Sequence, residues 1–225
     1  MQPLNRKFYS FRADANALGG HLEEPCEKCI PTLAPVSLPA VGGVAMARSE
    51  AFTLDEIVRI SSAYTRVSGR QHADGSASTL ITAVVEGVNI LEVVTARRVV
   101  AQVSILVPEK GPLQISLIGS RFEGLQLAGR ECRPKPNPRQ EWITRDPKSG
   151  NILSSLIDGL EEDGDPKTSH GGHVVQIPGF GRIALGEVRL SGDSVQLVMI
   201  RADLGCPVKG GVTICCGGGG GIGEL

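Results

Sequence analysis

The sequence predicts an all-β protein, mainly an antiparallel sandwich or a short β-solenoid, with one short helix and extended termini. Segments rich in Val, Ile and Leu alternate with turn residues, among 29 glycines and 14 prolines in 225 residues. This pattern is typical of sheets built from many short strands. A strand–glycine–strand phrase also recurs, which indicates that one supersecondary unit is used more than once.

The repeated phrase reads apolar-Glu-Gly-apolar-amide-apolar. It occurs at residues 85–90 as Val-Glu-Gly-Val-Asn-Ile and at residues 122–127 as Phe-Glu-Gly-Leu-Gln-Leu, with a looser copy at residues 177–186. Glycine inside a strand pattern marks a bulge, a corner or a close approach of another backbone. The phrase therefore predicts structural roles for its glycines, which are Gly87, Gly124, Gly179 and Gly181.

Three glutamates, Glu86, Glu123 and Glu187, recur beside these glycines. A carboxylate that recurs in a structural unit favours a structural role over acid–base catalysis. We expect such a glutamate to pair with Arg97 or Arg130 at a turn.

The elements follow one another in a definite order along the chain. Residues 1–45 are predicted as an extended arm spaced by prolines. Residues 46–131 form a first β lobe, and 173–214 form a second β lobe that completes the same domain. A Pro-rich connection at 132–172 contains a helix at 151–161, because apolar residues there recur at helical spacing. Residues 215–225 are predicted as a flexible Gly-rich tail.

Charge and hydropathy exclude some partners. The chain has 23 basic and 24 acidic residues, for a net charge of −1, so no basic surface for nucleic acid is expected. No apolar run approaches the roughly 20 residues of a membrane span. The N-terminus has basic residues without an apolar segment behind them, so the default compartment is cytoplasmic, and assembly outside the cell stays open.

Cysteines give the sharpest chemical signal. Cys26 and Cys29 form a C-x-x-C pair, and Cys215 is followed by Cys216. Four thiolates in two pairs are a known zinc ligand set, so these four residues are the candidate metal ligands. Disulfides or free structural thiols are the favoured alternative, and a redox pair is a further one. No cofactor is predicted, with zinc as the open exception.

Other chemical motifs are weak. His170 and His173 stand three residues apart beside an acidic stretch and could bind a divalent metal only from a loop. A polar loop that enters a strand is the simpler interpretation. No nucleophile elbow or phosphate-binding loop is present, so no catalytic residue is assigned.

Several of these motifs resemble a family of uncharacterised bacterial proteins. The matching pieces include Val-Glu-Gly-Val-Asn-Ile-Leu-Glu-Val-Val-Thr-Ala at 85–96 and Ile-Pro-Gly-Phe-Gly at 177–181. They are also loosely similar to the β-rich, small-residue repeats of bacterial surface proteins, which are classified by the anchors that attach them to the cell. The resemblance implies a β-rich fold and no established activity.

The sequence favours a non-enzymatic structural or self-assembling subunit in which an arm or an edge strand is exchanged between protomers. One alternative is a ligand-binding β-sandwich that uses loops at one end, with Trp142 on a concave surface. The second alternative is a zinc- or thiol-dependent enzyme that uses the cysteine or histidine clusters.

Overall fold

The computed structural model describes residues 9–137, 143–144, 155–162, 170–171, 173–191, 194–205, 207–220 and 223–224. Throughout these ranges the chain forms strands, turns and bends, and every strand pair is antiparallel. The prediction of an all-β fold is confirmed.

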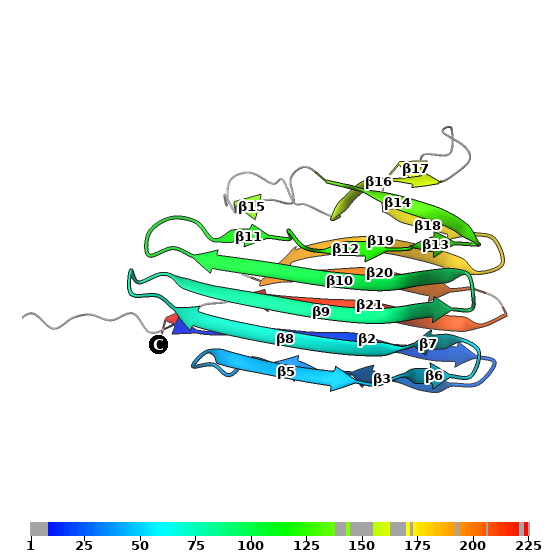
Figure 1. The fold of residues 1–225 in the computed structure, drawn as a ribbon, viewed down its shortest axis with the longest axis horizontal. Coiled ribbons are helices and arrows are strands. Elements are labelled where there is room, and N and C mark those ends of the chain that lie inside the picture. Colours follow the sequence, from blue (N-terminus) through cyan, green and yellow to red (C-terminus); the bar gives the residue numbers. More distant parts are fainter. Residues whose placement is uncertain are drawn as a thin grey trace, which may run out of the picture.

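The described residues form two large sheets (Figure 1). The front sheet comprises β5 (Gly43–Ser49), β6 (Phe52–Leu54), β7 (Val58–Ile60), β8 (Ser62–Gln71), β9 (Ala77–Ile90), β10 (Val94–Val107), β11 (Gln114–Ser116), β12 (Arg121–Glu123), β13 (Gln126–Leu127), β14 (Arg130–Pro136), β15 (Ile143–Thr144), β16 (Ile157–Glu162) and β17 (His170–Gly171). The back sheet comprises β2 (Ala13–Glu24), β3 (Lys28–Leu33), β4 (Val36–Ser37), β18 (Val174–Ile177), β19 (Gly181–Ser191), β20 (Ser194–Leu204) and β21 (Lys209–Gly220). A separate pair joins β1 (Tyr9–Ser10) to β22 (Gly223–Glu224).

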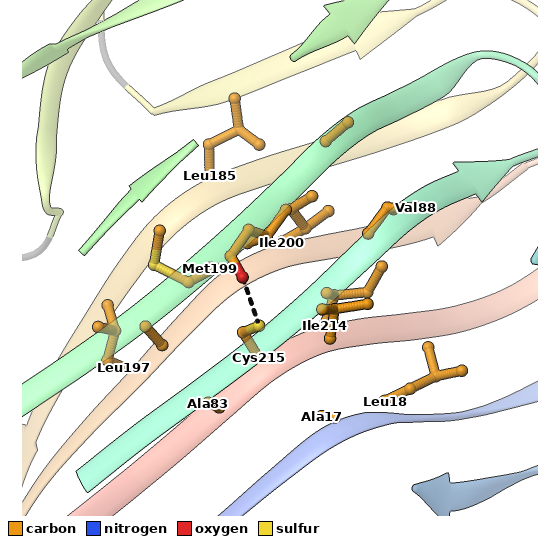
Figure 2. Close-up of a cluster of buried hydrophobic side chains, with 14 of the residues drawn as sticks. Ala17, Leu18, Ala83, Val88, Leu185, Leu197, Met199, Ile200, Ile214 and Cys215 are labelled. Carbon is orange, nitrogen blue, oxygen red and sulfur yellow. Dashed lines mark hydrogen bonds between the residues drawn. The ribbon is translucent and has the colours of Figure 1, made fainter. Parts of the chain in front are cut away.

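One hydrophobic core lies between the two sheets. Side chains of a strand alternate between its two faces, and on β8 the core-facing set is Ala63, Thr65 and Val67. Figure 2 shows Ile214 and Cys215 of the back sheet among the core residues, together with Ala83 of the front sheet. The packed side chains therefore hold the two sheets together as a sandwich.

A transverse kink crosses the front sheet at the repeated phrase. Gly87 and Gly124 have φ angles of +63° and +61°, and the register places both opposite Arg97, one on each side of β10. Val85 and Val88 are both buried although they are three residues apart. The left-handed glycine therefore shifts the inside–outside alternation by one residue, as a bulge does.

The back sheet has a matching kink. Gly186 on β19 and Cys215 on β21 have φ angles of +61° and +52°. The register places Gly186, Met199, Cys215 and Ala17 in one row across four strands. Neighbouring strands shift their inside–outside alternation in the same cross-sheet row. The strand pairing therefore continues on both sides of each kink.

The predicted flexible tail is wrong for residues 215–220, which belong to β21, and for residues 223–224, which form β22. Gly217 and Gly219 face the core, and a Cβ atom there would lie 2.9 and 2.8 Å from side-chain atoms of Ile81. The glycines leave room for a large side chain of the opposite sheet, so the run reflects close packing and not low complexity.

The predicted N-terminal arm is wrong for most of its described part. β2 pairs with β21 on one side and with β3 and β4 on the other, so it lies within the back sheet. Its residues Ala15, Ala17, Leu18 and Leu22 are buried. Small side chains made the segment look unstructured in sequence, while its main partner lies some 200 residues later in the chain.

The prediction of a Pro-rich connection at 132–172 is wrong in part, because β14 and β16 pair as strands there. The helix predicted at 151–161 is wrong for residues 157–161, which form β16; residues 151–154 lie outside the described part. A register shift between Lys135 and Pro136 lets both Ile157 and Leu160 face the core. This bulge produces apolar residues three apart, the spacing that had indicated a helix.

Candidate self-association edge

The four predicted zinc ligands are not brought together. Cys29 lies opposite His21 on β2, whereas Cys216 lies opposite Asn16, five residues earlier on the same strand. Cys26 is exposed at the β2–β3 turn. Within the described ranges, no three His, Cys, Asp or Glu side chains gather in a way that could hold a metal ion.

Cys215 and Cys216 differ sharply in environment. The Cys215 thiol is buried and donates a hydrogen bond to the backbone oxygen of Val99 in the front sheet, at 3.4 Å (Figure 2). Burial raises the pKa of Cys215. Burial also raises the pKa of Cys216, against the opposing effects of Thr213 and Arg201. The buried thiol of Cys215 connects the sheets and is not a metal ligand candidate in this fold.

Of the two histidines predicted as a pair, only His173 has a described side chain. His173 is half-buried just before β18, and burial together with nearby Arg182 lowers its pKa. The side chain of His170 lies outside the described part of the chain, and so does Trp142.

The predicted structural glycines occupy two kinds of position. Gly87 and Gly124 form the front kink. Gly179 lies in the turn between β18 and β19 with a φ of +74°. Gly181 lies at the start of β19, where a Cβ atom would meet the backbone oxygen of Asp203 at 2.1 Å. All four thus have conformations or surroundings that disfavour a larger residue.

Charged pairs line the outer face beside each kink. Glu123 pairs with Arg121 at 2.8 Å and with Arg97 at 3.4 Å, and Arg97 is one of the two partners expected for the recurring glutamates. Glu86 instead pairs with Arg98 at 3.7 Å. Glu187 on the back sheet pairs with Arg201 and with Arg189. Each glutamate therefore has a structural partner, which explains why the phrase contains a carboxylate.

The feature that sequence reasoning missed is the edge strand β5. The described residues give β5 one strand partner, β8, so its other side is open (Figure 1). Ala45 and Ala47 pack toward the core, while Val44 and Met46 point outward and are 55% and 61% exposed. An edge strand with one free side offers unpaired N–H and C=O groups to another strand.

Apolar side chains gather around this edge. Val41, in the loop before β5, is 92% exposed. Leu80 on β9 lies in the same cross-sheet row as Val44, and Tyr64 on β8 lies beside Arg48. We name the exposed set Val41, Val44, Met46, Tyr64 and Leu80 the β5 patch. Among the described residues, the other exposed large hydrophobic residue is Ile118.

The two edge strands of the back sheet, β3 and β18, have protections that natural proteins use. β3 contains Pro31, and its Lys28 pairs with Asp55 at 2.6 Å. β18 has four residues and is followed by Pro178. β5 has seven residues, no proline and a single charge, at Arg48. The alternation Val-Ala-Met-Ala-Arg was the sequence signal for it.

Fold and edge together define a class: an antiparallel β-sandwich with an open, apolar edge strand. Among the described residues no helix is long and apolar enough to cross a membrane. The chain belongs to the family of the domain of unknown function DUF8256, which matches residues 8–149 and 138–191. No curated protein and no solved structure matches the chain. Like the family that the motifs resemble, DUF8256 has no assigned activity.

Proposed function

We propose that the chain is a non-enzymatic, self-assembling structural subunit in which β5 of one copy pairs with β5 of a second copy. The observation that carries this proposal is the unprotected edge of β5 with its outward Val44 and Met46. Strand addition at a free edge supplies main-chain hydrogen bonds, and the apolar row supplies burial.

The strand is suited to pairing with itself. In an antiparallel pair with a two-fold axis at Met46, the two Met46 side chains face each other, and Val44 of each copy faces Arg48 of the other. The two arginines then lie four positions apart along the strand direction, so no like charges are directly opposite. A net charge of −1 does not oppose association of two copies.

The exchanged element in this proposal is β5 and not the N-terminal segment, because β2 is already paired on both sides within its own sheet. A contact between identical edges is isologous and closes at a dimer. A filament would need a second contact of a different kind.

The test compares two matched variants by light scattering over a range of concentrations. Met46→Lys places a charge in the centre of the β5 row, and Ile118→Lys changes the exposed hydrophobic residue outside the patch. We expect the natural chain and the Ile118 variant to be dimers and the Met46 variant to be a monomer. A natural chain that stays monomeric at its highest soluble concentration, or a Met46 variant that stays dimeric, contradicts the proposal.

A further inference from the structure

A groove runs along the outer face of the back sheet, at the end of β21. Its volume is about 540 Å³, and it is largely open to solvent. Arg12 and Asp14 form one wall, Ser194 and Gln196 form the other, and Gly218–Gly220 form the floor.

The register explains the shape of the groove. Gly218 on β21 lies between Asp14 on β2 and Gln196 on β20 in one cross-sheet row. The two walls are therefore two strand spacings apart, about 9.5 Å between backbones. Since glycine has no side chain on the middle strand, the groove is about as wide as one extended chain.

The floor of the groove offers few groups for hydrogen bonding to a ligand. β21 is paired on both sides at Gly218, and the N–H of Gly220 donates to the backbone oxygen of Arg12 at 3.0 Å. The backbone hydrogen bonds of the floor are used within the sheet, so the floor presents mainly glycine Cα–H groups. Recognition of polar groups therefore falls to the walls.

The walls combine donors and acceptors. Arg12 offers only donors, Asp14 as a carboxylate offers only acceptors, and the side-chain amide of Gln196 offers both. The two formal charges cancel. An anionic ligand would be repelled by Asp14, and a cationic ligand would be repelled by Arg12. The hydroxyl groups of a neutral ligand can both donate and accept hydrogen bonds.

We infer that this groove binds a neutral saccharide chain. A sugar ring has an apolar C–H face and a rim of hydroxyl groups, which complement a plain floor between polar walls. The groove lies on the back sheet and the β5 edge lies in the front sheet, so the inference does not depend on self-association.

The test is an array of neutral glycans, followed by calorimetric titration with cellohexaose, maltohexaose and the strongest array ligand. Gln196→Ala and Arg12→Ala alter the two walls. His21→Ala is the matched control, since His21 lies on the same outer face of β2 beyond the groove. All three side chains are exposed, and a thermal unfolding scan checks that each variant folds.

The natural chain should bind at least one neutral glycan. Either wall variant should weaken that binding by about tenfold, the loss expected for one or two hydrogen bonds, and His21→Ala should not. Binding to no neutral glycan, binding to charged glycans only, or equal binding by all variants overturns the inference. The monomeric Met46→Lys variant should bind as the natural chain does, so a failure of one proposal is distinct from a failure of the other.

Discussion

Gly217 of β21 lies directly beneath Ile81 of β9, so close that a Cβ atom on the glycine would stand 2.9 Å from Ile81 Cγ2. This contact joins the C-terminal glycine run to the centre of the opposite sheet. It turns a segment that looks like a linker into part of the core.

Gly217→Ala should therefore destabilise the fold by about 1–3 kcal/mol, the usual effect of overpacking a close-packed core. Gly211→Ala is the control, because a Cβ atom there meets nothing within 4 Å. In urea unfolding, the double variant with Ile81→Ala should be more stable than the sum of the single effects predicts. Strict additivity would contradict the contact.

The kink glycines should differ in their tolerance of alanine. At Gly87 an added Cβ would lie 2.0 Å from Ser61 Oγ, whereas at Gly124 the nearest atom is Arg97 Cβ at 3.3 Å. Both positions have left-handed backbones, which cost about 1–2 kcal/mol for a residue with a Cβ. Gly87→Ala should lower the free energy of unfolding more than Gly124→Ala, and the reverse order would argue against the described kink.

Thiol reactivity should follow burial. Cys26 and Cys29 are exposed, Cys216 is partly buried, and Cys215 is buried with a raised pKa. Because the thiolate is the reactive form, iodoacetamide should label Cys26 and Cys29 first and Cys215 only after unfolding. Peptide mass spectrometry in native buffer and in denaturant measures this order. Rapid native labelling of Cys215 would be incompatible with its place in the core.

His173 should make stability depend on pH. Burial and Arg182 lower its pKa below 6.5 in the folded state, so the unfolded chain binds the proton more readily. The favourable contribution is present above the unfolded pKa and is lost as the pH falls toward the folded pKa. His173→Gln should reduce the difference in unfolding free energy between pH 7.5 and pH 5.5. An unchanged difference would assign the pH dependence to other groups.

Local patterns in the sequence were sufficient where the structure depends on neighbouring residues. The Glu-Gly phrase predicted strand interruptions, and Gly87 and Gly124 have left-handed backbones. The expectation that the recurring glutamates pair with Arg97 or Arg130 holds in part, because Glu123 contacts Arg97 while Glu86 and Glu187 pair with other arginines. Turns made by unusual residues were missed. Within the predicted first β lobe, Leu91 and Glu92 lie in the β9–β10 turn with φ angles of +50° and +56°.

By itself the sequence determined the all-β class, because alternation of apolar residues and frequent turn residues are local properties of the chain. Only the tertiary structure decided that residues 13–24 and 209–220 pair as neighbours in one sheet. That pairing depends on contacts between segments far apart in sequence, which no local pattern encodes. It also decided which strand is left at the edge, and therefore that β5 is open, because an edge is defined by the absence of a second neighbour.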